Sequence, residues 1–224
     1  MKKFLALFII LILPSALYVF LTAGKERSFV RLPYFGPKKV ALTIKDNKAS
    51  ADTLFYQVIP FSFINESGEN VTNTGLRGKI WTACFINDTD KHYAPSISTL
   101  FDRIEERTNL DTGLRLLTFF LDSAGRHELK TYSNKVHAGR RQIFLTGKGQ
   151  SIREFAIDAF YKPLDSSYTK GFSKFFLVDK EGCIRGVYDA LSIKETDRLV
   201  DEIGMLEAAY FIQNEKRNKS KTPD

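Results

Sequence analysis

Two apolar runs, each followed by a helical pattern, constrain the fold of this chain more than any other feature. Residues 80–86 and 114–121 are almost continuously apolar, which is typical of strands buried on both faces of a sheet. After the first run, a polar loop leads to Pro95, a residue that suits the first turn of a helix. Apolar residues then recur at helical spacing, at Ile97, Leu100, Phe101 and Ile104. Such strands need parallel neighbours and helices on both sides of the sheet, so the sequence predicts an α/β fold.

The remaining pattern extends this prediction to one domain over residues 57–212. Alternating residues around the turn Ser67-Gly68 predict an opening β-hairpin. Further elements are expected as strands at 142–145, 174–178 and 183–188 and as helices near 129–136, 152–159 and 193–206. The order is a hairpin, then βαβαβα, then ββα, which is the thioredoxin-like order with an N-terminal extension. In that fold the active centre lies where the first central strand meets its helix, here between Lys79 and Pro95.

The N-terminal segment carries an uncharged stretch. Residues 4–23 hold twenty apolar-rich residues, enough for a helix to cross a bilayer core of roughly 30 Å. The apolar core of a cleaved signal peptide is shorter, about 7–15 residues. The sequence therefore predicts an uncleaved transmembrane anchor within residues 1–24. Basic residues flank the stretch on both sides, so its charges do not decide which side of the membrane the body occupies.

The positive charge of the chain is confined to its N-terminal part. The first 48 residues hold nine Lys or Arg and two acidic residues, which accounts for the whole formal charge of +7. A neutral body argues against nucleic-acid binding, which needs a basic face on the folded domain. The Pro- and Gly-containing residues 25–56 are expected to form a membrane-proximal arm or linker, and the polar residues 213–224 a disordered tail.

Few residues with catalytic or metal-binding chemistry stand out. Cys84 lies inside the first apolar run, where a small core residue is expected, and Cys183 is too distant in sequence for a CxxC-type motif. Asp90 and His92 lie in the loop after the first run, and Asp122 follows the second. These three side chains could hold a hard divalent ion weakly, but a solvated polar loop explains them more simply. His127 and His137 are expected at the surface.

Four stretches make the chain resemble the SCO/SenC family of membrane-anchored, thioredoxin-like proteins. They are Ile59–Phe63 with Asn65 and Gly68, Leu76–Trp81, Leu145–Gly147 and Phe176–Asp189. The resemblance implies a link to copper delivery to cytochrome c oxidase. It also implies a body on the periplasmic side of the inner, cytoplasmic membrane, held by a single N-terminal anchor.

The sequence departs from the family where the family binds copper. The cysteines of the family's CxxxCP motif fall on Asp90 and Ala94, its proline falls on Pro95, and its histidine ligand falls on Gly171. Copper(I) prefers soft thiolate and imidazole ligands, and a dithiol cycle needs two neighbouring sulfurs. We therefore expect no copper site, no cofactor and no catalytic residue, and the chain is not expected to be an enzyme.

Three functions follow from these expectations. The first is a non-catalytic assembly or interaction factor at the membrane, with respiratory oxidase subunits or a CxxxC-containing paralogue as partners. The second is a residual copper chaperone or other metal binder that uses Asp90, His92 and Asp122. The third, which the sequence favours least, is a thiol peroxidase or disulfide oxidoreductase that relies on Cys84.

Overall fold

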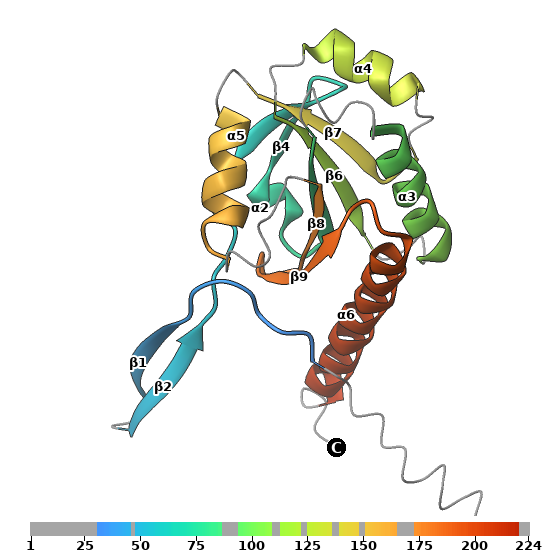
Figure 1. Ribbon diagram of the computed structural model, residues 1–224. Coiled ribbons are helices and arrows are strands. Elements are labelled where there is room, and N and C mark those ends of the chain that lie inside the picture. The colour runs from blue at the N-terminus through green and yellow to red at the C-terminus, as the bar shows by residue number, and fades with distance from the viewer. Residues whose placement is uncertain are drawn as a thin grey trace, which may run out of the picture. The chain divides into compact units, whose positions relative to one another are not determined.

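A mixed β-sheet forms the centre of the structure, a computed structural model (Figure 1). The structure describes residues 31–45, 48–86, 94–108, 113–121, 125–135, 139–147, 151–164 and 173–219. Residues 32–224 form one unit and residues 1–31 another. In the described ranges the sheet has seven strands in the order β4-β3-β7-β6-β5-β8-β9. Their bounds are Ser62–Asn65 (β3), Asn70–Thr72 (β4), Trp81–Ile86 (β5), Arg115–Phe120 (β6), Gln142–Thr146 (β7), Lys174–Val178 (β8) and Ile184–Asp189 (β9).

The strand directions confirm the predicted α/β class. Strands β5, β6 and β7 run parallel to one another, and β3 and β8 add antiparallel strands on either side of them. Strand β9 pairs antiparallel with β8. The two long apolar runs thus lie at the centre of the sheet, where parallel strands are covered on both faces.

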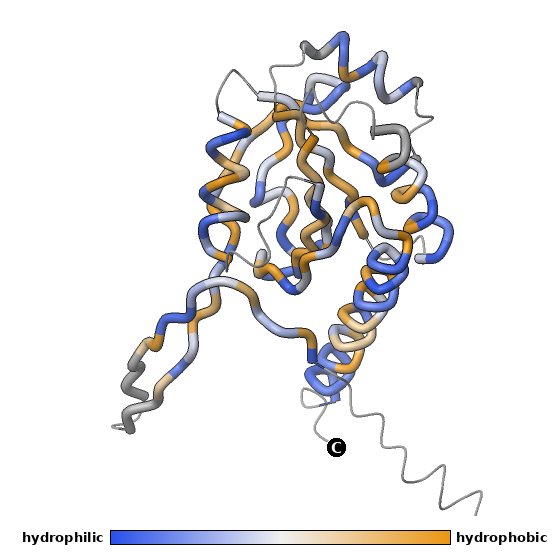
Figure 2. The backbone as a smooth tube through the Cα atoms, viewed as in Figure 1, coloured by the Kyte–Doolittle hydropathy of each residue, from blue (hydrophilic) through white to orange (hydrophobic). Residues whose placement is uncertain are grey.

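Helices cover both faces of this sheet (Figure 1). Their bounds are Asn73–Leu76 (α2), Ala94–Arg107 (α3), Arg126–Lys135 (α4), Ser151–Ala156 (α5) and Ile193–Lys219 (α6). Helix α5 continues into a π-helical turn, η3 (Ile157–Tyr161). Helices α5 and η3 pack on one core cluster, and α3 and α6 pack on the other. Figure 2 shows the apolar residues concentrated on the strands between these helices.

Strand β5 divides its side chains between the two clusters. Trp81, Ala83 and Phe85 belong to the cluster under α5 and η3, whereas Cys84 and Ile86 belong to the cluster under α3 and α6. All six residues of the strand are buried. The expectation that Cys84 is a core residue is therefore confirmed, and Trp81 is buried as well.

A buried arginine, Arg185, binds the N-terminal arm and is itself paired with Asp179 at the turn between β8 and β9. The carboxylate of Asp179 and the guanidinium of Arg185 lie 2.9 Å apart, with side-chain exposures of 0% and 8%. Asp179 Oδ1 also accepts hydrogen bonds from the backbone N–H groups of Glu181 and Cys183. Arg185 donates its other hydrogen bonds to the carbonyl oxygens of Leu32 and Pro33, at 2.6 and 3.0 Å. A buried arginine with these partners fixes the path of the arm.

Aromatic stacking continues this attachment along the arm. The ring of Tyr34 lies 3.8 Å from the Arg185 guanidinium on one side and 3.7 Å from the ring of Phe55 on the other. The backbone N–H of Phe35 donates to the carbonyl oxygen of Ile184. Leu32 is buried in the same cluster as α3 and α6. Residues 32–37, within the predicted arm or linker, are therefore part of the folded body.

The same predicted arm contains a second, two-stranded sheet. Strands β1 (Lys39–Lys45) and β2 (Lys48–Leu54) pair antiparallel, from Lys39 opposite Leu54 to Lys45 opposite Lys48. The sequence carries a signal for β1, because Val40, Leu42 and Ile44 alternate with less apolar residues. The partner strand β2 carries a weaker signal, because most of its residues are polar or small.

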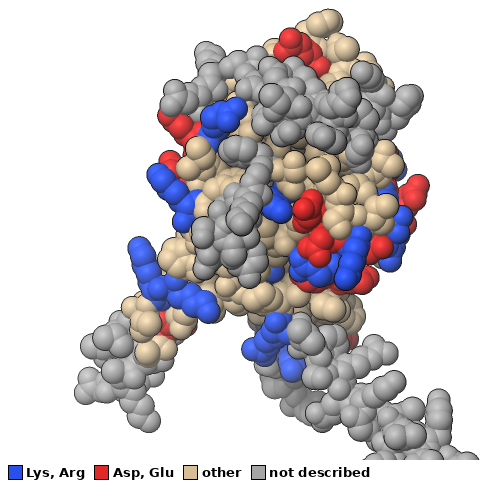
Figure 3. All heavy atoms as spheres, in the orientation of Figure 1, with Lys and Arg blue, Asp and Glu red and all other residues tan. Residues whose placement is uncertain are grey.

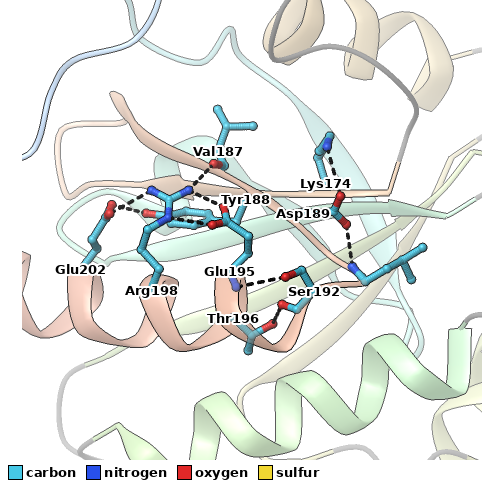
Figure 4. Close-up of polar contacts among 10 residues, drawn as sticks. Lys174, Val187, Tyr188, Asp189, Ser192, Glu195, Thr196, Arg198 and Glu202 are labelled. Atoms are coloured by element: carbon cyan, nitrogen blue, oxygen red, sulfur yellow. Dashed lines mark hydrogen bonds and ion pairs between the residues drawn. The ribbon is translucent and has the colours of Figure 1, made fainter.

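A polar network joins the start of α6 to β9 (Figure 4). Arg198 donates hydrogen bonds to the carboxylates of Glu195 and Glu202 and to the carbonyl oxygen of Val187. Its guanidinium lies 4.3 Å from the ring centre of Tyr188, whose hydroxyl donates to Glu202. The network fixes the angle at which α6 leaves the sheet.

Helix α6 is longer than the sequence pattern indicates. Residues 213–219 continue the helix, which differs from the disordered tail expected from Gln213 onward, and residues 220–224 lie outside the described ranges. Basic residues in the last turn (Lys216, Arg217 and Lys219) interact favourably with the carboxyl end of a helix. No helix in the described ranges is both long and apolar enough to span a membrane. The predicted anchor at residues 1–24 lies outside them.

Candidate functional site

The strands next to the candidate residues in the sequence end side by side, along one strand-end edge of the sheet. Ile86 lies opposite Phe120, and Cys84 lies opposite Phe175, so the ends of β5 and β6 and the start of β8 are neighbours. Sites of open α/β sheets form at such strand ends. Asp90, His92, Asp122 and Gly171 belong to the loops that leave this edge, and all four lie outside the described residues. The structure therefore confirms that their strands are adjacent and leaves their ligand roles as predictions.

The helix after the first loop begins where the sequence predicts it. Helix α3 starts at Ala94, so Pro95 lies in its first turn. Ile97, Phe101 and Ile104 are almost fully buried along one side of this helix. The second cysteine position of the family motif thus falls on the first residue of a helix that is held against the core.

Aromatic rings fill the space directly below this edge. The ring of Phe85 lies 5.0 Å from that of Phe119 and 5.2 Å from that of Phe160, measured between ring centres. The rings of Tyr161 and Phe176 belong to the same cluster, with their centres 5.4 Å apart. The phenylalanine rings among them supply no metal donors, so they cannot provide a ligand at this edge.

The two cysteines lie at different levels of the sheet. Cys84 lies opposite Phe175, whereas Cys183 follows the turn beyond Val178, at the other end of β8. Three residues of strand separate these levels by about 10 Å, and a disulfide needs Cα atoms closer than about 7 Å. Both cysteines are buried thiols that are not joined in a disulfide. The described part of the chain therefore holds no pair of thiols that could cycle between dithiol and disulfide.

The surroundings of Cys183 suppress its thiolate. Its side chain lies beside the carboxylates of Asp179 and Glu181 in a residue that is 5% exposed. Burial raises the pKa of the Cys183 thiol to about 12, and the two carboxylates add to this effect. Since the thiolate is the nucleophile and the metal ligand, Cys183 is inert near neutral pH.

We expect both cysteines to resist thiol-reactive reagents in the folded protein. At pH 8 a thiol with the pKa of Cys183 has roughly a thousandfold less thiolate than an exposed cysteine, and Cys84 is fully buried. Labelling by a disulfide reagent should be at least about 100-fold slower than in guanidinium, where two thiols should react.

A Ser67→Cys variant, with its thiol at an exposed turn, provides the positive control for this labelling. Rapid labelling of native Cys84 would contradict the expectation and would favour a thiol enzyme.

A polar cleft beside α4 contains His127, the one histidine within the residues that the structure describes. The cleft has a volume of about 720 Å³ and is lined by Glu66, Ser67, His127, Lys130, Ser133 and Asn134. His127 is exposed, which confirms the expectation of a surface residue, and His137 lies outside the described ranges. Glu66 accepts a hydrogen bond from the backbone N–H of Phe144. Within the described residues, no group of three His, Cys, Asp or Glu side chains could hold a metal ion.

Comparison with known proteins finds relatives that are similar to this chain in sequence and in architecture. No family model matches the chain. Its sequence is 27% identical over 161 residues to the SCO1 protein homolog of Bacillus subtilis, across 68% of this chain and 83% of that protein. The solution structure of the soluble domain of Bacillus subtilis Sco1 is 25% identical, with a TM-score of 0.50 over 66% of this chain and 90% of that one. In sequence and in fold, the chain is similar to proteins of the SCO/SenC family. This confirms the resemblance seen in the four sequence stretches.

The SCO/SenC fold accounts for the central sheet and its helices. A structure of BsSco, a member of the Sco family of cytochrome c oxidase assembly proteins, superimposes with a TM-score of 0.56 at 23% identity, over 68% of this chain and 94% of that one. Bradyrhizobium japonicum ScoI, solved with copper bound, superimposes with a TM-score of 0.54 at 15% identity, over 67% and 99% of the two chains. The thioredoxin-like fold predicted from the order of elements is therefore confirmed.

Proposed function

We propose that this SCO/SenC protein is a membrane-anchored assembly or interaction factor for a cytochrome c oxidase, and that it acts without the family's copper ligands. Its partners would be oxidase subunits or a paralogue that retains CxxxC. Residues 1–24 would anchor it in the inner membrane, with the body in the periplasm. The relatives support the setting, because one belongs to a family of oxidase assembly proteins and another, from Bacillus anthracis, is a SCO1/SenC family lipoprotein.

The observation that carries the proposal is the position of the two sulfur atoms. The whole chain has two cysteines, and the strand register keeps them apart, one in the core and one at the opposite end of β8. A copper(I) site of two thiolates and an imidazole needs its sulfurs adjacent at the edge where α3 begins. Neither cysteine is at that edge, which also argues against a thiol-based enzyme.

The test is a copper(I) titration of the full chain in detergent, in competition with a chromophoric chelator. We expect no stoichiometric binding at sub-micromolar free copper(I), since the chain lacks adjacent thiolates. One equivalent bound with sub-micromolar affinity would refute the proposal.

The same titration with Mn²⁺ or Zn²⁺ addresses the alternative site at Asp90, His92 and Asp122. The adjacency of the ends of β5 and β6 favours this alternative. Divalent binding that His92→Ala abolishes would support it. Binding that is the same in both proteins would exclude it.

A further inference from the structure

The outer half of α6 extends beyond the core, next to the start of the folded arm. Leu206 is the last buried residue of the helix. Leu32, the first residue of the body, belongs to the same core cluster as Leu206, and Tyr210 packs against that cluster. Tyr210 also contacts the β8–β9 turn, where its hydroxyl donates to Glu181 and Lys180 Nζ lies 4.6 Å from its ring centre. The body therefore begins beside the outer half of α6.

This end of the body exposes apolar and basic side chains together. Phe211 is 65% exposed and Met205 is 42% exposed. The last turn of α6 adds Lys216, Arg217 and Lys219. Lys38 and Lys39 lie in a separate group of Lys and Arg side chains at the base of the β1–β2 hairpin (Figure 3), away from the end of α6 (Figure 1). Where α3 and α6 meet, by contrast, acidic and basic side chains alternate.

The length of the connecting chain limits how far Leu32 can lie from the predicted anchor. Eight residues, 24–31, separate the uncharged stretch from Leu32. At about 3.5 Å per residue, a fully extended connection spans roughly 30 Å. Between Gly24 and Lys39 the chain has five basic residues and one acidic residue. Such a segment is attracted to anionic lipid headgroups.

We propose that this end of the body is a lipid-facing surface, on which Phe211 enters the headgroup region of an anionic bilayer while Lys216, Arg217 and Lys219 contact its headgroups. The inference rests on the proposed anchor. An aromatic residue beside basic residues is the combination that binds interfacial helices to anionic lipid. The charge of these three residues complements the membrane, whereas the rest of residues 32–224 holds 25 basic and 25 acidic residues.

The proposal has a consequence for the candidate site. The arm is bound to Arg185 near the start of β9, beside the turn that follows β8. The loops that carry Asp90, Asp122 and Gly171 leave the other end of these strands. With the α6 end on the bilayer, the candidate edge faces away from the lipid, toward the soluble part of a partner.

Fluorescence quenching in vesicles tests the proposal with the full chain. Phe211→Trp and, as a control, Ile64→Trp are each reconstituted in vesicles of phosphatidylglycerol and phosphatidylcholine that contain a doxyl-labelled lipid. Ile64 is 39% exposed and lies opposite Thr146, at the candidate-site end of β7. The native Trp81 is 2% exposed and contributes the same background to both variants.

We expect Phe211→Trp to be quenched at least roughly twofold more than Ile64→Trp. This difference should be lost in 1 M salt. It should also be lost when Lys216, Arg217 and Lys219 are all replaced by Gln. Equal quenching of the two variants would overturn the proposal. Flotation of the same vesicles distinguishes failure of the lipid-facing surface from failure of the membrane anchor. A chain that floats after alkaline extraction without selective quenching disproves only the lipid-facing surface, whereas a chain that does not float disproves the anchor.

Discussion

Replacing Asp179 by alanine should lower the free energy of unfolding by about 3–5 kcal/mol, because breaking a buried ion pair leaves the other charge uncompensated. Arg185 would keep its place below the arm with only carbonyl partners. The backbone N–H groups of Glu181 and Cys183 would also lose their acceptor. Urea unfolding of the purified variant, followed by circular dichroism, measures the change.

The matched control is Asp158→Ala. Asp158 pairs with Lys162 one helical turn away, but the two side chains are 48% and 71% exposed, so the loss should be below about 0.5 kcal/mol. The double variant Asp179→Leu with Arg185→Met should recover part of the lost stability, since no charge remains buried. Equal effects of the two alanine substitutions would show that the buried pair does not stabilise the arm.

Restoring the family's ligands should create a copper(I) site where the native chain has none. We expect Asp90→Cys, Ala94→Cys and Gly171→His together to bind one equivalent of copper(I) at micromolar protein, since two thiolates and an imidazole suit this ion. Both cysteine positions flank the start of α3, and position 171 precedes β8, the strand beside β5. The measurement is the chelator competition used for the native chain.

A variant with serine at positions 90 and 94 and histidine at 171 controls for changes in the loops alone. It should bind no copper(I), because hydroxyl groups are poor ligands for a soft ion. If the cysteine variant also fails to bind, the counted register of the family motif on Asp90 and Ala94 is wrong. Binding by the cysteine variant would support the view that the scaffold is intact and that its ligands have been lost.

The central elements could be predicted from the sequence because burial on both faces leaves a strong pattern. Strand β5 corresponds to the apolar run at 80–86, and β8 has the predicted bounds, 174–178. Helix α3 follows from Pro95 and the helical spacing after it. In each case, one structural requirement fixes several neighbouring residues, so a single sequence contains enough signal.

Elements held by contacts from distant residues were harder to predict. The path of residues 32–37 depends on Arg185, about 150 residues later in the chain, and no local pattern reports such a contact. The outer half of α6 lacks apolar periodicity, because it has left the core. The four-residue helix α2 was not predicted; its N-cap is Thr72, whose side chain accepts a hydrogen bond from the backbone N–H of Gly75.

The candidate site, too, could be predicted from the sequence only in part. The sequence predicts which strand ends meet, and the register confirms it for β5, β6 and β8. The raised pKa of Cys183 depends on its burial and on the carboxylates of Asp179 and Glu181, which come together only through the fold of the β8–β9 turn. The positions of Asp90 and Gly171 rest on counting along a family motif, since no local pattern determines where loop side chains point.

The contacts on β9 bear on how this protein can meet a partner. Strand β9 is the last of the sheet, yet its outward carbonyl groups are occupied, that of Ile184 by Phe35 and that of Val187 by Arg198. A partner strand therefore cannot extend the sheet there without displacing the arm or α6. The opposite edge, β4, is three residues long, which also discourages strand addition. Association with a partner protein should thus proceed through side chains and loops, and neighbouring copies of the chain are protected from edge-to-edge aggregation.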